Sequence, residues 1–207
     1  MSEFFGKHPI VAVVRHADDQ NIVPIGEALL AGGIDSIEVT AETPDADLLI
    51  EKLDKELGDQ LYIGAGTVLD PETAEKMVKA GADYIVSPTL NVETIKSTKR
   101  LGKLSIPGAF TPTEILEAYE AGADCVKVFP AGILGSDYIK NLKGPLPQIP
   151  VMVTGGVDLG NTMKYIKSGA VAVGIGSQLV NAKDLKREED FRQLTNKATL
   201  FTNLFEG

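Results

Sequence analysis

The sequence predicts a single α/β domain in which eight parallel strands alternate with helices and close into a barrel. Three observations support this prediction: a length of 207 residues, a glycine-marked junction that recurs along the chain, and further apolar strands midway between these junctions. The length suits one sizeable core and is too short for two comfortable domains. We therefore treat residues 1–207 as one domain.

The recurring junction is a helix end marked by glycine and followed at once by a β-branched strand. Four segments have this form: AGGIDSIEV (31–39), AGADYIVSP (80–88), AGADCVKVFP (121–130) and SGAVAVGIG (168–176). Their shared glycines stand 41 to 48 residues apart. Such an interval is too long for one strand and one helix and suits two of each, so one more strand is expected within every interval.

The additional strands are present in the sequence. IVAVVR (10–15) precedes the first junction, and LYIGA (61–65), LSI (104–106) and VMVT (151–154) lie between the junctions. Amphipathic helices separate the strands, and in one of them Ile115, Leu116, Tyr119 and Ala123 are spaced for a single buried face. Eight strict alternations predict a (β/α)8 TIM barrel. An open, doubly wound sheet is the alternative, because alternation alone does not separate the two.

Helices are expected to flank this barrel at the N- and C-terminal ends. The tail 181–207 is predicted to be a last amphipathic helix on the outside, with an apolar face made of Phe191, Leu194, Ala198, Phe201 and Phe205. At the other end, MSEFFGKHPIVAVV (1–14) has an acid near its start and only a short apolar stretch. This pattern favours neither a signal peptide nor a membrane span.

The composition excludes several functional classes. A net charge of −9, with no basic cluster to offset it, argues against a nucleic-acid-binding surface. The single cysteine, Cys125, excludes an internal disulfide framework, and two histidines are too few for a His- or Cys-rich metal site. We expect a cytoplasmic protein that needs no metal or other cofactor and has neither nucleic acid nor membrane as a partner.

Charged residues with inward parity near strand ends are the candidates for chemistry, because parallel barrels carry their active sites at the carboxyl ends of the strands. Period-two alternation turns Lys127 inward within 124–130 and Glu38 inward within 36–40. Arg15 ends the first strand on the same face as the inward valines before it. Burying a lysine is costly, so a chain that does so usually employs the amine for pairing or for chemistry.

These three charges together favour amine catalysis. An amine that is buried beside another cation loses affinity for its proton, which makes the neutral nucleophile available to attack a ketone. Glu38 then has the right chemistry to move protons on and off the substrate. Two other interpretations stay open: Lys127 and Glu38 as a purely structural buried ion pair, and Arg15 as a solvated charge at the rim.

Glycine-rich loops follow the last two strands. VMVTGGV (151–157) ends a strand at Gly155 and Gly156, and AVGIGSQLV (172–180) ends the next near Gly176 and Ser177. The loops after strands seven and eight form the recurrent phosphate site of (β/α)8 barrels, with backbone N–H groups donating to the anion. A phosphorylated small molecule is therefore the expected ligand.

The end of the third strand adds small residues to the predicted mouth of the barrel. In GAGTV (64–68), Gly64 and Gly66 leave space for the close approach of a ligand, and Thr67 offers a hydroxyl group.

The residues resemble a known family over nearly the whole chain: the short-barrel class I aldolases that cleave 2-keto-3-deoxy-6-phosphogluconate (KDPG) and 4-hydroxy-2-oxoglutarate (KHG). The similar segments are VAVVR (11–15), AGGIDSIEVT (31–40), IGAGTV (63–68), IVSP (85–88), IPG (106–108), VKVFPA (126–131), GPLPQIPVMVTGGV (144–157) and VGIGSQLV (173–180), in the family's order. No one segment is specific, but the combination is.

The resemblance implies a role for each candidate. Lys127 is expected to form a Schiff base with the keto carbon, and Glu38 to act as general acid and base, partly through a bound water. The remaining implied contacts are Arg15 and Thr67 with the pyruvyl carboxylate, Pro88 and Phe129 with the pocket wall, and Gly155, Gly156, Gly176 and Ser177 with the phosphate. A homotrimer without a metal, acting on a keto acid in the Entner–Doudoroff route of carbohydrate metabolism, is also implied.

One departure from the family pattern concerns substrate choice. Many members have an arginine four residues after the catalytic glutamate, where this chain has Glu42. Losing that cation is expected to weaken binding of an anionic group by ~1 to 3 kcal/mol. A related aldolase for another 2-keto-3-deoxy sugar acid is therefore an alternative. An isomerase or epimerase barrel and a non-catalytic phosphate-binding module are two further alternatives that share the glycine loops.

Overall fold

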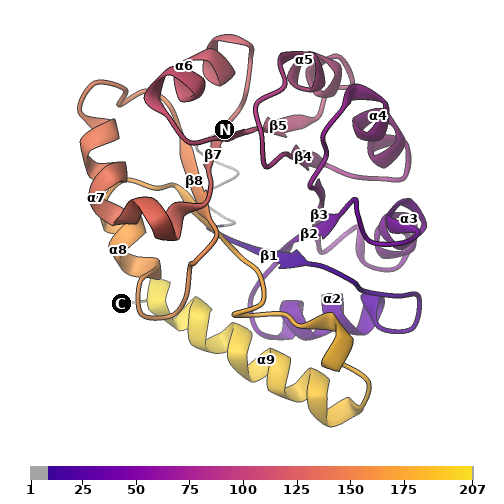
Figure 1. The fold of residues 1–207 in the computed structure, drawn as a ribbon. Coiled ribbons are helices and arrows are strands. Elements are labelled where there is room, and N and C mark those ends of the chain that lie inside the picture. The colour runs from indigo at the N-terminus through magenta and orange to yellow at the C-terminus, as the bar shows by residue number, and fades with distance from the viewer. Residues whose placement is uncertain (1–8, 207) are drawn as a thin grey trace.

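A computed structural model describes residues 9–206 and confirms the predicted barrel (Figure 1). Within these residues, nine parallel strands lie in the spatial order β5-β4-β3-β2-β1-β9-β8-β7-β6, and helices surround them. The N-terminal helix that the sequence led us to expect falls in residues 1–8 and so lies outside the described residues. The open doubly wound sheet is excluded by the way the strands close.

Strands and helices alternate along the chain, except that β6 follows β5 directly. The strands are β1 (Ile10–Val14), β2 (Ser36–Thr40), β3 (Tyr62–Gly66), β4 (Tyr84–Val86), β5 (Leu104–Ile106), β6 (Gly108–Ala109), β7 (Val126–Val128), β8 (Val151–Thr154) and β9 (Ala172–Ile175). The helices are α2 (Ile22–Ala31), α3 (Ala46–Leu57), α4 (Pro71–Lys79), α5 (Val92–Arg100), α6 (Pro112–Glu120), α7 (Ala131–Lys143), α8 (Thr162–Lys167) and α9 (Glu188–Thr202), with 3₁₀ turns η1 (Ala182–Asp184) and η2 (Asn203–Phe205).

The barrel closes through β5, which has the bounds predicted for the strand at 104–106, and through the short strand β6, which the sequence analysis did not predict. Pro107 separates the two because it has no N–H to donate to a ladder. Hydrogen bonds nevertheless continue on both sides of this segment: the Ser87 N–H donates to the Ile106 carbonyl at 3.2 Å, and the Lys127 N–H donates to the Pro107 carbonyl at 2.8 Å. The two ends of the sheet are therefore joined through a single residue.

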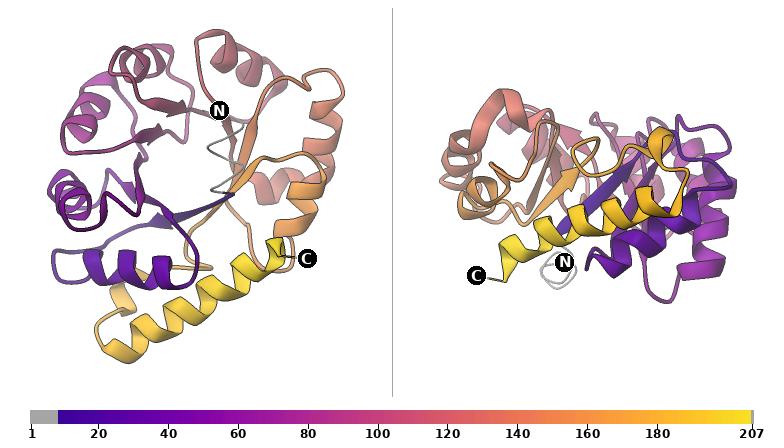
Figure 2. Two further views of the ribbon diagram at one scale, coloured as in Figure 1. Left: turned by 180° about the vertical axis from the view of Figure 1, so that it is seen from behind. Right: turned by 90° about the horizontal axis from the view of Figure 1, so that it is seen from below.

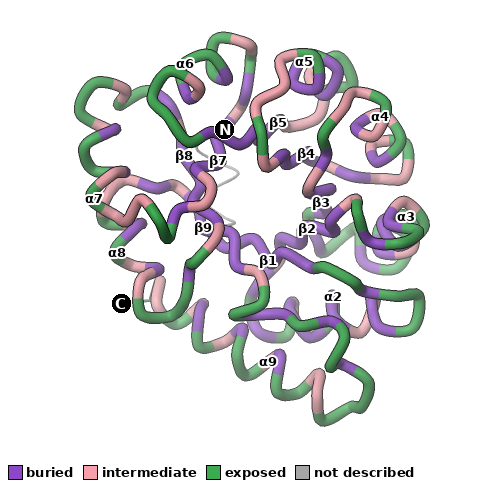
Figure 3. The backbone as a smooth tube through the Cα atoms, viewed as in Figure 1, coloured by how far each residue is buried: buried purple, intermediate pink, exposed green. Residues whose placement is uncertain are grey.

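Both faces of the sheet are buried, as in other parallel barrels (Figure 3). The outer face packs against the helices and forms the main core, which includes Ile37, Val39 and Ile63. The interior holds a smaller cluster, composed of Val11, Tyr84, Val86, Ile106, Cys125, Met152 and Ala172. The four junction glycines predicted from the sequence, Gly33, Gly81, Gly122 and Gly169, all have positive φ angles, which explains why glycine recurs there.

The C-terminal helix α9 packs across the outside of the barrel, as predicted (Figure 2). It begins later than expected, at Glu188, after η1. Leu194, Ala198 and Phe201 are buried, and the Thr195 and Thr202 hydroxyls donate to the Ala28 and Gly32 carbonyls of α2 and its end, each at 3.0 Å. Within residues 9–206 no helix combines the length and apolar character needed to cross a membrane.

The predicted buried face of α6 was wrong in part. Ile115 is fully buried as expected, but Leu116 and Tyr119 are more than one-third exposed, and Ala118 is buried instead. The helix therefore turns its Ile115 and Ala118 side to the sheet. Ala123, which follows the helix, is buried as predicted. Spacing gave one apolar face, and packing against the strands buries a face that only partly coincides with it.

Candidate active site

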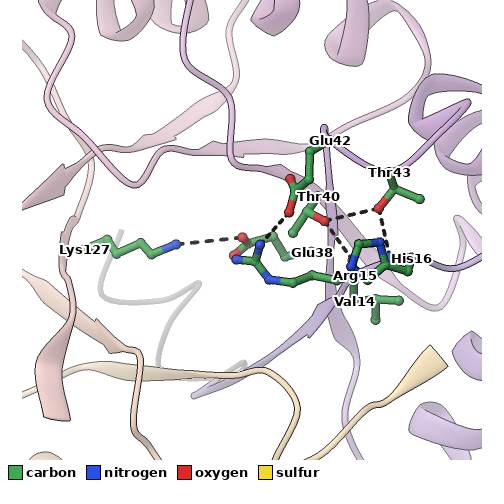
Figure 4. A network of polar contacts seen from close by, with 8 residues as sticks. All are labelled: Val14, Arg15, His16, Glu38, Thr40, Glu42, Thr43 and Lys127. Atoms are coloured by element: carbon green, nitrogen blue, oxygen red, sulfur yellow. Dashed lines mark hydrogen bonds and ion pairs between the residues drawn. The ribbon is translucent and has the colours of Figure 1, made fainter. Parts of the chain in front are cut away.

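Two charged side chains meet inside the barrel. Lys127 on β7 and Glu38 on β2 point towards each other across the interior, and Nζ of Lys127 lies 3.9 Å from Oε1 of Glu38 (Figure 4). Their side chains are only 3% and 0% exposed. The inward parity predicted for both residues is confirmed, and the structure brings them together from strands that are 89 residues apart in sequence.

The local sequence explains how Glu38 reaches this position. In β2, Ile37 and Val39 enter the outer core, so the alternate residues face the barrel interior. Opposite them, β3 has Gly66, where an added Cβ would lie 1.9 Å from Oε1 of Glu38. Gly66 therefore makes room for the carboxylate of Glu38. The sequence led us to expect that this glycine admits a ligand, and the structure gives a different reason for it.

Burial raises the pKa of Glu38 above its ordinary value of 4.5, because desolvation disfavours the charged form. The positive charges of Lys127 and Arg15 act in the opposite direction, and Glu42 adds a smaller upward influence on the pKa. Neither carboxylate oxygen has a hydrogen-bond partner among the described residues. A carboxyl group with a raised pKa is better suited than an ordinary glutamate both to accept and to return a proton.

The contact between Lys127 and Glu38 differs from a well-satisfied structural ion pair. Buried ion pairs are stable only with close geometry and additional hydrogen bonds to the remaining lone pairs. Here the separation is long and both oxygens of Glu38 lack hydrogen bonds within the described chain. Orphaned buried oxygens of this kind are rare in stable cores and favour a functional role for the pair.

Arg15 lies at the mouth of the barrel, directly after β1. Its Nη1 contacts Oε1 of Glu42 at 2.5 Å, and its side chain is 48% exposed. The expectation that Arg15 faces the interior is therefore met only in part, because the guanidinium sits at the rim. It still lines the cavity formed by the glycine-rich loops, so it is more than an isolated surface charge.

Hydrogen bonds between two loops fix the position of Arg15 relative to Glu42 (Figure 4). The His16 N–H donates to Oγ1 of Thr43 at 3.1 Å. Oγ1 of Thr43 in turn lies 3.2 Å from Oγ1 of Thr40, which donates to the Val14 carbonyl at 3.4 Å. The end of β1 is thereby tied to the end of β2, so the ion pair is set by backbone anchored on both sides.

The predicted phosphate loops form one wall of a cavity of about 180 Å³. Its lining residues are Val13, Arg15, Phe129, Thr154, Gly155, Gly156, Val157, Gly174, Gly176, Ser177 and Gln178. Gly155 and Gly156 have φ angles of 85° and 80°, a conformation that favours glycine. Of the lining residues only Arg15 carries a charge, so an anion here would depend on Arg15 and on polar groups of the loops.

Sequence reasoning missed Thr154, the last residue of β8. Its hydroxyl oxygen is buried and has no hydrogen-bond partner within the described residues. Gly174 on the neighbouring strand makes room for it, since an added Cβ there would lie 2.4 Å from Oγ1 of Thr154. The signal was available: Thr154 immediately precedes the predicted glycine pair at a strand end.

The remaining residues singled out from the sequence lie at several places around the barrel mouth and interior. Phe129 lines the cavity, and its ring centre lies 5.3 Å from Nζ of Lys127. Thr67 follows β3 with a φ of 57°, a left-handed conformation that is uncommon for threonine. Pro88 packs through its backbone against Gly108. Gly64 does not open the mouth as expected, because its missing side chain accommodates the ring of Tyr84.

A larger cavity, about 590 Å³, opens between the loop after β1 and the segment before α9. His16, Lys183 and Phe191 are among its lining residues, and none of Arg15, Phe129 and the glycine-rich loops that line the smaller cavity is. Size therefore does not identify the site. Among the described residues there is no group of three or more His, Cys, Asp or Glu side chains placed to hold a metal ion.

Comparison with known proteins decides the family. The family model described as KDPG and KHG aldolase matches residues 1–196. The chain belongs to this aldolase family. Its members are lyases, and the curated relative 2-dehydro-3-deoxy-6-phosphogalactonate aldolase of Escherichia coli K12 is 36% identical over 178 residues, covering 85% of this chain and 86% of the relative.

Solved structures of the KDPG and KHG aldolase family match the whole fold. KDPG aldolase from Legionella pneumophila, with pyruvate captured as a covalent carbinolamine, has a TM-score of 0.87 at 30% identity, and the match covers 96% of both chains. A cube-shaped protein cage, designed by fusing symmetric oligomeric domains, has a TM-score of 0.90 at 32% identity. The match covers 97% of this chain and 73% of the cage chain.

Proposed function

We propose that this aldolase cleaves KDPG to pyruvate and glyceraldehyde 3-phosphate, or KHG to pyruvate and glyoxylate, through a Schiff base on Lys127. The observation that carries the proposal is the contact of 3.9 Å between the buried Lys127 amine and a Glu38 carboxylate whose oxygens have no hydrogen-bond partner among the described residues. The pyruvate carbinolamine in the Legionella pneumophila relative supports the same chemistry.

The reaction begins with the amine. The neutral Lys127 Nζ adds to the C2 carbonyl of the keto acid and forms a carbinolamine, and Glu38 gives a proton to the hydroxyl that leaves as water. The product is an iminium ion. In the free enzyme the carboxylate of Glu38 lies 3.9 Å from Nζ and the centre of the Phe129 ring 5.3 Å from it, so both are placed to stabilise this positive charge.

Bond cleavage follows from the iminium ion. Glu38, now a carboxylate, takes the proton of the C4 hydroxyl, the C3–C4 bond breaks, and its electron pair moves into the iminium to give an enamine. The aldehyde departs. Glu38, directly or through a water, returns the proton to C3, and hydrolysis releases pyruvate and restores the amine. The raised pKa of Glu38 suits a group that both donates and accepts in one cycle.

Substrate binding is proposed to use the mouth and the glycine loops. Arg15 and Thr67 would hold the pyruvyl carboxylate, and Pro88 and Phe129 would shape the wall. The phosphate would be held by the loop residues Gly155, Gly156, Gly176 and Ser177, which line the cavity beside Arg15. Relatives that act on different keto-deoxy sugar acids leave another 2-keto-3-deoxy-6-phosphosugar acid as the alternative substrate.

Reductive trapping tests the proposal. Incubation with pyruvate and borohydride is expected to leave a stable pyruvyl adduct on Lys127, located by mass spectrometry of peptides. Lys127→Ala should lose both the adduct and turnover while keeping its circular dichroism spectrum. Lys143→Arg is the control, because Lys143 is a partly buried lysine whose pKa is lowered by burial, yet it donates to the Ile149 carbonyl outside the site.

The proposal fails if Lys127→Ala retains wild-type activity or if the adduct forms on Lys143 instead. A phosphate-binding module would bind the phosphorylated ligand without any adduct, and an isomerase or epimerase would turn over its substrate without trapping pyruvate. These outcomes separate the three functional classes.

Assembly and location complete the proposal. We infer a cytoplasmic homotrimer that acts in the Entner–Doudoroff breakdown of sugar acids. The similarity to a domain of a cage built from symmetric oligomers supports symmetric assembly. The free, buried thiol of Cys125 is consistent with a reducing compartment. Sedimentation equilibrium measures the subunit number directly, and a monomer would contradict the trimer.

A further inference from the structure

The pair of Arg15 and Glu42 has consequences for which keto acids the site accepts. Four charged side chains stand in or beside the described site: Arg15 and Lys127 are basic, and Glu38 and Glu42 are acidic. Lys127 acts as the nucleophile, so it is not available as a fixed cation for a carboxylate. Arg15 is then the one remaining cation for the acid groups of a substrate.

Glu42 already engages that cation. Its Oε1 lies 2.5 Å from Nη1 of Arg15, a distance that leaves no room for a substrate oxygen between them. The contact is anchored on both sides, because the loop after β1 is tied to the end of β2 through Thr40 and Thr43. Any carboxylate that approaches Arg15 must therefore share it with Glu42.

We propose that Glu42 is a specificity-determining residue that selects against keto diacids, because it shares Arg15 with the substrate and repels a second carboxylate at the mouth of the barrel. The inference rests on the proposed function and refines it. A substrate that has one carboxylate near the reacting carbonyl shares the Arg15 guanidinium with Glu42. When the substrate has a second carboxylate, three carboxylates surround one guanidinium, and this like-charge arrangement is costly.

The length of the substrate decides where its second anion lies. In KHG the second carboxylate is three carbon–carbon bonds from the reacting carbonyl, so it stays near Glu38 and Glu42. In a phosphorylated six-carbon sugar acid the second anion is farther along the chain and reaches the glycine-lined cavity at Gly155 and Gly176, where N–H groups of the loops can donate to it in addition to Arg15. Glu42 therefore favours long phosphorylated sugar acids over short keto diacids.

Two uncleaved keto acids give a direct test. Pyruvate has one carboxylate, and 2-oxoglutarate has the carbon skeleton of KHG without the hydroxyl that is needed for cleavage. We would measure the concentration of each that half-saturates borohydride trapping on Lys127. Glu42→Gln, which removes the charge and keeps the shape, is expected to lower this concentration about tenfold more for 2-oxoglutarate than for pyruvate.

Salt and a matched variant separate this role from a structural one. The Arg15–Glu42 pair is at the rim, so high ionic strength should narrow the difference between the two keto acids in the wild type and leave Glu42→Gln nearly unaffected. Glu93→Gln is the control, because it removes the same charge from an exposed ion pair with Lys96. It should leave the ratio of the two half-saturating concentrations unchanged.

Each outcome has one consequence. If adducts form but Glu42→Gln keeps the wild-type ratio, or if Glu93→Gln changes the ratio equally, the role of Glu42 is overturned and the proposed aldolase mechanism stands. If neither keto acid gives an adduct in the wild type, the proposed function fails, and the inference fails with it.

Discussion

Two layers of the barrel interior differ in whether their buried polar groups form hydrogen bonds. In the lower layer, the Tyr84 hydroxyl donates to the Ile37 carbonyl at 2.8 Å and lies 3.0 Å from the Ser36 hydroxyl, surrounded by apolar side chains. In the upper layer, Glu38 and Thr154 have buried oxygens without hydrogen-bond partners among the described residues. Ser36 and Glu38 are two residues apart on one strand, so the change from hydrogen-bonded to unpaired polar groups occurs between successive inward-facing residues.

This difference in hydrogen bonding suggests that the lower layer serves the stability of the fold and the upper layer the proposed chemistry. A buried polar group that is fully bonded stabilises a unique core, whereas an unpaired one costs free energy. The lower layer therefore resembles ordinary core, and the unpaired polar atoms of the upper layer fit the proposed role in binding a substrate. Neighbouring glycines show the same division, since Gly64 makes room for the ring of Tyr84 and Gly66 makes room for the carboxylate of Glu38.

The largest effect is expected from Glu38→Gln, which removes the proposed proton acceptor from the upper layer. We expect kcat to fall about 10²- to 10⁴-fold, the range for loss of a general acid–base group. Steady-state kinetics of pyruvate release measures the loss. A variant within threefold of wild type would show that another group transfers the proton.

The same substitution should stabilise the fold at neutral pH. Because burial raises the pKa of Glu38, its contribution to folding is most favourable below its ordinary value of 4.5 and is lost as the pH rises through the folded value. Glu38→Gln should thus unfold at a higher temperature than wild type at pH 8, and the difference should shrink towards pH 4. Thermal unfolding of both proteins from pH 4 to pH 8 tests this prediction. A difference in unfolding temperature that does not vary with pH would contradict it.

Gly66→Ala should come next in size and act mainly on activity. The added methyl group would lie 1.9 Å from Oε1 of Glu38, so the flexible carboxylate must move away from Lys127. We expect kcat to fall about 10²-fold from this misplacement, with little loss of stability. Kinetics and urea unfolding are measured on the same preparation.

Gly64→Ala is the matched change in the lower layer and should give the opposite result. Its methyl group would lie 2.1 Å from the ring of Tyr84, which cannot move within a packed layer. Stability is expected to fall by ~1 to 3 kcal/mol, the usual cost of overpacking, while the folded enzyme keeps its kcat. If both alanine variants lose activity equally, the two layers are not distinct.

The smallest effect is expected from Tyr84→Phe. The change leaves the Ile37 carbonyl and the Ser36 hydroxyl without their shared partner, at a cost of about 1 kcal/mol. Activity should be unaffected, since Tyr84 is in the lower layer. Urea unfolding and kcat together check this prediction. A marked loss of kcat would show that the lower layer also contributes to activity.

Local pattern was enough to predict much of this molecule. The glycine-marked junctions and the intervening strands predicted the alternating barrel, because glycine with positive φ and period-two burial are local properties of the chain. The alternation of side chains along each strand was enough to predict that Lys127 and Glu38 point into the barrel. The pattern failed in part for α6, where packing against the sheet buries Ala118 and leaves Leu116 and Tyr119 exposed, and it did not predict the short strand β6 that follows Pro107.

Tertiary structure decided the distances and partners. The sequence showed Glu42 as a departure from the family pattern, but its contact with Arg15 depends on two loops joined through Thr40 and Thr43. The roles of Gly64 and Gly66 also emerged only when strands β2, β3 and β4 were side by side. Sequence periodicity determined which way each side chain points, since that depends on neighbouring residues. Closure of the barrel decided what each side chain meets, because those partners come from distant strands.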